Sequence, residues 1–136
     1  MNGARAVQKS ILKKFPETDL DVTIVWIDML ASDNAQAARR SAKMFDDPRV
    51  RQFHDPRATR LAGKAFAHGL IQEGRGLAWD IYMFYERGAR WDEHPPQPAE
   101  WMHQLGGGQR ADADRFRSGP ELEAGLREAM QKLAHK

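Results

Sequence analysis

Cysteine is absent from this sequence of 136 residues. Without cysteine the chain can form no disulfide bond, no zinc–thiolate site, no iron–sulfur cluster and no thiol nucleophile. The absence leaves the redox compartment open, because a protein without cysteine persists in oxidising and reducing environments alike. Any chemistry that this chain performs therefore depends on other side chains.

The sequence also lacks a long apolar run and an excess of one charge. Its longest apolar stretch, Val22–Leu30, is interrupted by Thr23 and Asp28 and is far shorter than the roughly 20 residues that span a bilayer. The segment Met1–Lys14 has no continuous apolar core, so it does not resemble a secretory signal. The net charge is only +2, which gives no electrostatic reason to expect nucleic acid or anionic lipid. We therefore expect a cytoplasmic protein that binds neither a membrane nor nucleic acid.

Apolar residues make up 41% of the sequence and charged residues 29%, which is the composition of a globular protein with a buried core. The length is that of one domain. Hydrophobic periodicity and turn residues predict alternating helices and strands. The predicted helices cover 4–15, 35–45, 57–71 and 120–136, and the predicted strands cover 22–30, 50–54, 77–85 and 89–91. This order is typical of an α/β three-layer sandwich.

Two of the predicted strands carry specific expectations. The segment Val22–Leu30 is rich in β-branched residues and nearly continuously apolar, so we expect it to be covered on both faces. The turn Glu86-Arg87-Gly88 joins the strand over 77–85 to a short return strand, Ala89-Arg90-Trp91, in a β-hairpin.

The chain divides into three predicted parts. An α/β core covers 1–105, and a glycine-rich connection that contains Gly106-Gly107-Gly108 covers 106–119. A C-terminal helix over 120–136 packs on the core through an apolar stripe at helical spacing. That stripe consists of Leu122, Leu126, Ala129, Met130 and Leu133.

Part of this pattern, from Val7 to Trp91, resembles the thioredoxin superfamily and especially its peroxiredoxin-like and thiol-oxidoreductase-like branches. The segment Val50-Arg-Gln-Phe-His-Asp55 occupies the family's short strand that ends in Asp. The segment Gly76–Gly88 occupies the family's small-Pro-Thr-apolar-apolar-Phe-x-x-x-Gly position, and Phe84 and Gly88 match it. The resemblance implies a thioredoxin-like sandwich, with a mixed sheet and helices on both faces.

The departures from that family concern its catalytic segment. In the family a strand and a Cys-x-x-Cys loop precede the helix that corresponds to 4–15, whereas this sequence begins at the helix. The family's cis proline is replaced within Ala78-Trp79-Asp80. Thiol–disulfide exchange needs a thiolate of low pKa. We therefore expect a thioredoxin-like protein without redox activity.

The strand that the family has and this sequence lacks lies between the strands that match 22–30 and 77–85. Without it these two strands either pair directly or each leave an edge open. An apolar open edge invites pairing with a second chain, so we predict a homodimer. A compact monomer with a rearranged sheet is the alternative.

Carboxylates and a histidine lie at the ends of predicted strands. Asp28 interrupts an apolar strand near its carboxyl end, where α/β folds place much of their chemistry; alternatively, it caps the next helix or accepts backbone N–H bonds. His54, Asp55 and Asp80 have side chains that suit a hard-metal site. Adjacent strand residues point to opposite faces, and the spacing matches no metal motif. We therefore predict no metal or cofactor. His54 and Asp55 are the weak candidates for a metal site. Alternatively, Asp55 is a turn carboxylate and His54 is a partly exposed histidine.

Aromatic residues form the other unusual group, which consists of Trp79, Trp91, Trp101 and His103. Tryptophans near a proline-rich loop can line a ligand cleft or a protein-binding face. Alternatively, these rings cover the sheet and close the core where a strand is missing. Together with Asp28 and Asp80 they are our candidate ligand- or partner-binding residues.

Two further features favour a structural interpretation. Ser32, Asp33 and Asn34 are N-cap residues for the helix that follows, although a helix N-terminus can also meet an anion. The segment 39–64 carries eight Lys and Arg against three Asp, which suits an acidic partner or RNA as well as a solvated helix face. Without interleaved aromatic residues we favour the solvated face.

Two functions follow from these patterns. The first is a non-redox interaction scaffold that acts through its tryptophan-rich face or by dimerising. The second is a ligand- or metal-binding enzyme that uses a cleft at the strand ends around Asp28, His54, Asp55 and Asp80.

Overall fold

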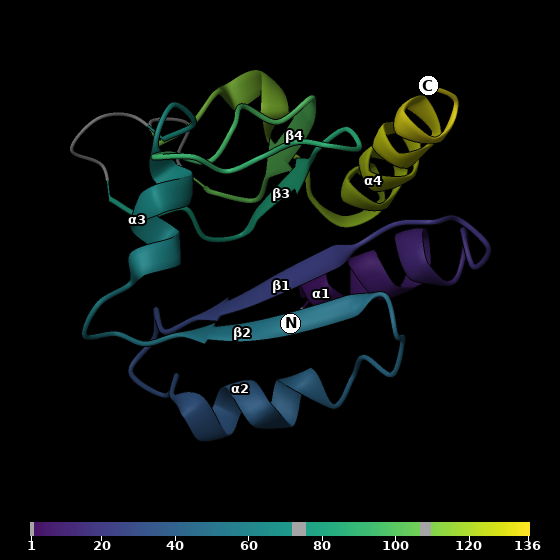
Figure 1. Cartoon of the computed structure of the whole chain (residues 1–136). Helices are drawn as coiled ribbons and strands as arrows, with labels where there is room; N and C mark the ends of the chain where they lie inside the picture. The colour runs from purple at the N-terminus through teal and green to yellow at the C-terminus, as the bar shows by residue number, and fades with distance from the viewer. Residues whose placement is uncertain (1, 72–75, 107–109) are drawn as a thin grey trace.

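A computed structural model describes residues 2–71, 76–106 and 110–136, so Gly107 and Gly108 of the predicted connection lie outside the described residues. The protein has a mixed α/β fold (Figure 1). Its helices are α1 (Asn2–Val7), which continues as the π-helical turn η1 (Gln8–Leu12), α2 (Ala35–Ala42), α3 (Leu61–Ala67), the 3-10 turn η2 (Ala113–Arg115) and α4 (Gly119–Ala134). Its strands are β1 (Val22–Ile27), β2 (Val50–Asp55), β3 (Ile81–Phe84) and β4 (Glu100–His103). Among the described residues, no helix is long and apolar enough to cross a bilayer.

The four strands form two separate sheets in the described part of the chain. Strand β1 pairs with β2 in parallel, from Val22 opposite Val50 to Ile27 opposite Asp55. Strand β3 pairs with β4 in antiparallel fashion, from Ile81 opposite His103 onward. Strands β1 and β3 do not pair with each other. Of the two arrangements predicted for them, the structure adopts the one in which each leaves an edge open.

The predicted return strand over 89–91 is wrong. The turn does form at Gly88, where φ is +86°, but the strand that pairs with β3 is β4, after a longer connection. Three prolines, Pro95, Pro96 and Pro98, have no N–H to donate to a ladder, and pairing begins where Ala99 N donates to the Phe84 carbonyl at 2.8 Å. The prolines therefore delay the return strand by about ten residues relative to an ordinary hairpin loop.

The core consists of two clusters, and the larger one contains the predicted stripe of α4. Leu122, Leu126, Ala129 and Met130 are buried against α1, η1 and the sheet residues Phe84 and Met102, while Leu133 is partly buried at the edge. The smaller cluster joins Ile71, Ala78, Leu105 and Ala111. Neither cluster contains a residue of β1 or β2.

The prediction that Val22–Leu30 is covered on both faces is wrong. The strand ends at Ile27, and its apolar side chains are only half-buried. On β2, Phe53 is 57% exposed. A strand becomes fully buried only when other strands and helices surround it, and here β1 has a neighbour on one edge alone. The most β-branched apolar segment of the chain therefore retains accessible apolar surface.

Truncation of Leu126 tests whether α4 organises the core. Leu126 has no exposed surface, so Leu126→Ala should lower the free energy of unfolding by about 2–5 kcal/mol. Leu30 is 68% exposed, so Leu30→Ala should change it by less than about 0.5 kcal/mol. Urea denaturation followed by circular dichroism measures both. Equal losses in the two variants would contradict this description of the core.

Candidate functional site

The free edge of β1 is defined by its hydrogen bonds to β2. Val22 N donates to the Arg49 carbonyl at 2.9 Å, and Asp28 N donates to the Asp55 carbonyl at 3.1 Å. Backbone groups alternate sides along a strand, so even-numbered residues of β1 face β2. The N–H and C=O groups of Thr23, Val25 and Ile27 therefore point away from β2, toward the free edge.

The same alternation defines the free edge of β3. Gln104 N donates to the Asp80 carbonyl at 2.9 Å, and the register pairs Tyr82 with Met102. Residues 80, 82 and 84 therefore direct their backbone groups to β4. Ile81 and Met83 direct theirs to the other edge, which carries no ladder in the described residues.

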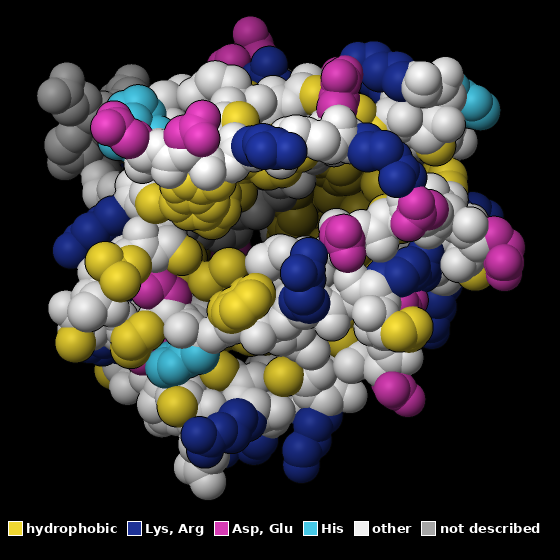
Figure 2. Space-filling view, in the orientation of Figure 1, with side chains coloured by type: hydrophobic (Ala, Val, Ile, Leu, Met, Phe, Trp, Pro, Cys, Tyr) yellow, Lys and Arg dark blue, Asp and Glu magenta, His cyan; other side chains and the backbone are white. Residues whose placement is uncertain are grey.

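The two free edges face each other across a hollow. In Figure 1 β3 is the strand of its sheet nearer to β1, and β1 is the strand of its sheet nearer to β3. Figure 2 shows that this space is open on one side of the molecule and that hydrophobic side chains form much of its wall. We call the space between the free edges of β1 and β3 the central hollow.

Two polar clamps hold the β1–β2 sheet at a fixed place beside the hollow. At the start of β2, the Arg49 guanidinium donates to the carbonyls of Phe15 at 2.7 Å and Leu12 at 3.2 Å. It also pairs with Asp47 at 2.7 Å, which lowers the pKa of Asp47 to about 2. At the far end, Arg60 Nε donates to the Asp28 carbonyl at 3.0 Å. The sheet is thus tied to η1 at one end and to the α3 region at the other.

The accessible surface is larger than expected for a chain of this mass. It measures 8964 Å², whereas a folded monomer of 15.5 kDa has about 7,200 Å². The surplus of about 1,800 Å² is about twice the roughly 800 Å² that one partner buries in a standard protein–protein interface.

The structure brings Asp28 and His54 together at the ends of β1 and β2. His54 Nε2 lies 2.8 Å from Asp28 Oδ1, and the backbone N–H of Arg57 donates to Asp28 Oδ2 at 3.2 Å. The hydrogen bond from His54 is the main cause that holds the pKa of Asp28 below its usual value. Asp28 therefore accepts both a side-chain and a backbone bond, as in the strand-end alternative.

Asp55 and Asp80 have separate roles. Asp55 is buried and accepts a hydrogen bond from the backbone N–H of Gly63 at 2.9 Å, so it positions the start of α3. Asp80 has a φ of +50°, and burial of its carboxyl group raises its pKa. Within residues 2–71, 76–106 and 110–136, no three His, Cys, Asp or Glu side chains gather into a group that could hold a metal ion.

Of the predicted cap residues Ser32, Asp33 and Asn34, Asn34 is the N-cap of α2, and Asp33 instead binds the backbone that precedes it. Asn34 Oδ1 accepts a hydrogen bond from Ala37 N at 2.9 Å, at the first turn of α2. Asp33 Oδ2 accepts bonds from the backbone N–H groups of Met29 and Leu30, at 2.8 and 2.6 Å.

The four predicted aromatic residues occupy three environments. The Trp101 and His103 rings are stacked 5.8 Å apart, whereas Trp91 is half-exposed and meets Phe66 edge-on at 5.0 Å. Trp79 packs against the smaller core cluster, and its buried indole N–H has no hydrogen-bond partner in the described residues. The buried His103 makes two hydrogen bonds through its ring. Its Nε2–H donates to the Asp112 carbonyl at 2.8 Å, and its Nδ1 accepts from Leu105 N at 3.1 Å. These bonds fix the orientation of the ring, so His103 has a structural role.

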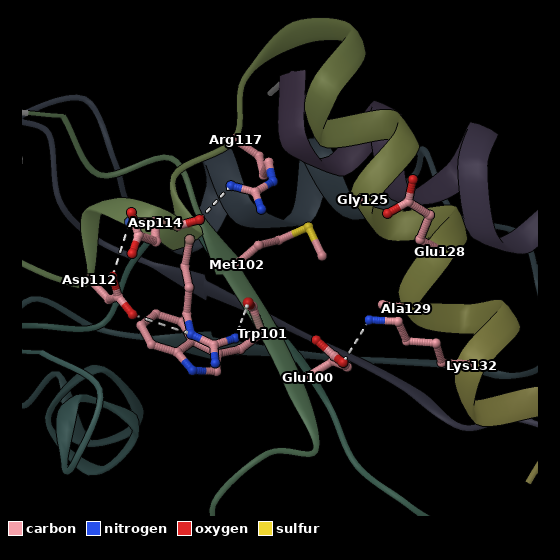
Figure 3. Close-up of a pocket in the computed structure, with 11 residues that line it drawn as sticks. Glu100, Trp101, Met102, Asp112, Asp114, Arg117, Gly125, Glu128, Ala129 and Lys132 are labelled. Atoms are coloured by element: carbon pink, nitrogen blue, oxygen red, sulfur yellow. Dashed lines mark hydrogen bonds and ion pairs between the residues drawn. The ribbon is translucent and has the colours of Figure 1, made fainter.

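A cavity of about 410 Å³ lies between β4, η2 and α4 (Figure 3). Arg115 sits over the Trp101 ring at 4.9 Å, and Lys132 pairs with Glu100 at 3.0 Å on the opposite side. Met102 and Gly125 lie between these pairs, and a Cβ on Gly125 would come within 3.0 Å of the Met102 sulfur. Arg115, Lys132 and Gly125 could not be predicted from the sequence, because only the fold brings η2 and α4 beside β4.

No family model matches this chain, and neither a curated protein nor a solved structure is significantly similar to it. The geometry of the molecule is therefore the basis for any functional assignment.

The pair formed by Asp28 and His54 makes stability depend on pH. The pKa of Asp28 is lower in the folded protein than the usual 3.8, so the folded state favours the carboxylate. This contribution is fully present above the unfolded pKa and disappears as the pH falls through the folded pKa. Asp28→Asn should therefore lower the urea midpoint at pH 7 and have a smaller effect near pH 3. A difference that is the same at both pH values would contradict the role of the carboxylate.

Proposed function

We propose that this protein is a non-redox interaction scaffold that binds a partner polypeptide through the central hollow. The proposal includes a thioredoxin-like arrangement in which the strands run in the order β2, β1, hollow, β3, β4. The order of elements and the facing free edges of β1 and β3 support that arrangement. The absence of cysteine excludes the thiol chemistry of the thioredoxin superfamily.

The half-buried state of β1 is the observation that carries the proposal. An apolar strand with one unpaired edge is a template for another chain. Contiguous apolar surface of this kind, set in a hollow, marks a site of protein association. The surplus of accessible surface is larger than the roughly 800 Å² that one partner loses in a standard interface, so it leaves room for such an association.

The alternative function, a ligand- or metal-binding enzyme at the strand ends, has one supporting contact, the hydrogen bond between Asp28 and His54. The second oxygen of Asp28 is occupied by the Arg57 N–H, and Asp55 is occupied by Gly63. These bonds satisfy the carboxylates within the protein, so we favour the scaffold.

The homodimer remains a prediction within this proposal, as does a cytoplasmic location. Two copies that each leave an apolar hollow open would associate weakly at high concentration and separate on dilution. Light scattering over a concentration series tests this. A mass that stays at 15.5 kDa throughout would contradict self-association.

Binding of a permanently unfolded polypeptide tests the scaffold. Labelled, reduced and carboxymethylated lysozyme should bind the wild type saturably in a fluorescence anisotropy titration. Val25→Lys places a charge on the free edge of β1 and should weaken binding at least tenfold. Leu30→Lys removes a more exposed apolar side chain beyond the strand and should change binding less than twofold. Absence of saturable binding, or equal effects of the two variants, would overturn the proposed function.

A further inference from the structure

We infer that the cavity between β4, η2 and α4 is a binding site for a free α-amino acid with an apolar side chain. The cavity measures about 410 Å³, which lies within the roughly 300–1,000 Å³ of small-molecule sites. Its lining belongs to β4, η2, α4 and the segment between the last two, so it shares no residue with the facing edges of β1 and β3. The inference therefore stands independently of the proposed function.

Arg117 presents an unused pair of hydrogen-bond donors beside this cavity. Its backbone N–H donates to the His103 carbonyl at 2.9 Å, which ties the residue to the end of β4. Its Nη1 donates to the carbonyls of Asp114 at 2.7 Å and Phe116 at 2.8 Å. Among the described residues, its Nε–H and Nη2–H groups have no acceptor. These two groups form the edge of a guanidinium that matches both oxygens of a carboxylate, so this edge binds the carboxylate of the ligand.

Glu128 supplies the opposite charge from α4. It lies three residues after Gly125, and residues at this spacing are neighbours on a helix. A Cβ at Gly125 would lie 3.8 Å from Cγ of Arg117, so Arg117 and Glu128 flank the same position of the helix. Figure 3 shows the Glu128 carboxylate turned toward Gly125. In the part of the chain that the structure describes, this exposed carboxylate has no hydrogen bond or ion pair, so it is free to bind an ammonium group.

Other charged groups of the cavity already have partners within the protein. Arg115 lies over the Trp101 ring at 4.9 Å, and its Nε is 3.6 Å from a carboxylate oxygen of Asp112. Lys132 pairs with Glu100 at 3.0 Å. These pairs bring one positive and one negative charge each, so they favour neither an anionic nor a cationic ligand.

The charges that remain select a ligand that carries both signs. A ligand with only negative charge would be repelled by Glu128 and by the exposed carboxylate of Asp114. A ligand with only positive charge would be repelled by Arg117. A zwitterion with adjacent carboxylate and ammonium groups compensates Arg117 and Glu128 together, and a free α-amino acid has this arrangement.

Apolar side chains complete the lining and define the third part of the ligand. Met102 and Ala129 are buried and line the cavity together with Trp101. A Cβ at Gly125 would come within 3.0 Å of the Met102 sulfur, so a larger residue there would displace Met102. An aliphatic side chain on the ligand would lose apolar surface to water against these residues, which favours its binding.

Titration of the isotope-labelled full chain with L-leucine tests the inference, with binding measured from amide and arginine Nε–H chemical shifts. L-Leucine should bind saturably and shift the Nε–H signal of Arg117. N-acetyl-L-leucine lacks the ammonium charge and L-leucine amide lacks the carboxylate, so each should bind at least tenfold more weakly. Equal binding of leucine and either derivative, or no saturable binding of leucine, would overturn the inference.

Substitutions at the two charged groups test their separate roles. Arg117→Gln should weaken leucine binding at least tenfold and leave the binding of leucine amide unchanged. Glu128→Gln should weaken leucine binding at least tenfold and leave that of N-acetyl-leucine unchanged. The matched controls Arg127→Gln and Glu121→Gln remove charges from α4 outside the cavity lining and should change leucine binding less than twofold.

The exposed position of Glu128 keeps the test decisive if Arg117→Gln fails to fold. Equal leucine binding by the wild type and a folded Glu128→Gln would contradict the proposed recognition of the ammonium group. Val25 lies outside the cavity, so Val25→Lys should weaken the binding of unfolded lysozyme and leave leucine binding unchanged. If lysozyme binds and leucine does not, the amino-acid site is wrong and the scaffold stands. If leucine binds and lysozyme does not, the scaffold is wrong and the amino-acid site stands.

Discussion

The alternation of backbone hydrogen bonds along β1 is the constraint on which the rest of this structure depends. Its even-numbered residues form the ladder with β2, so the N–H and C=O groups of Thr23, Val25 and Ile27 are directed to the opposite edge. Strand β3 faces that edge with its own free backbone groups and does not approach closely enough to pair. The described residues therefore form two separate sheets, and the edges of β1 and β3 that face each other stay unpaired.

The edges stay unpaired because both sheets are anchored elsewhere. Strands β3 and β4 pack on α4, which contributes most of the larger core cluster. Strands β1 and β2 contribute nothing to either cluster and are held by Arg49 at one end and by Arg60 and Asp28 at the other. Each anchor uses backbone carbonyls as acceptors, so collapse of β1 onto β3 would break several of these hydrogen bonds. The central hollow is thus maintained by the same bonds that position the sheets.

Local patterns in the sequence predicted the order of the elements and the buried face of α4. Leu122, Leu126 and Ala129 recur at helical spacing whatever surrounds the helix, so the buried stripe could be found without the fold. The pattern of Val22–Leu30 predicted a strand correctly and its burial incorrectly, because burial depends on neighbouring strands that a local pattern does not contain.

The candidate site was predicted less well, for a related reason. Open edges on β1 and β3 could be predicted from the order of the elements, whereas the chemistry of individual side chains was a poor guide to the site. His103 and Asp55 are satisfied by backbone groups, and Trp91 lies apart from Trp101. The backbone groups of Val25 and Met83 face the hollow. The identity of a side chain does not indicate in which direction the backbone groups of its residue point. Long-range contacts such as Arg49 to Phe15 are likewise invisible to periodicity.

Amide hydrogen exchange along β1 tests the central claim most directly. In the free protein, at a concentration where light scattering gives the mass of one chain, Val25 and Ile27 should exchange much faster than Ile24 and Trp26. Addition of reduced and carboxymethylated lysozyme should slow the exchange of Val25 and Ile27. Equal protection of all four amides in the free single chain would show that β1 already has a second partner, and it would contradict the open hollow on which this account depends.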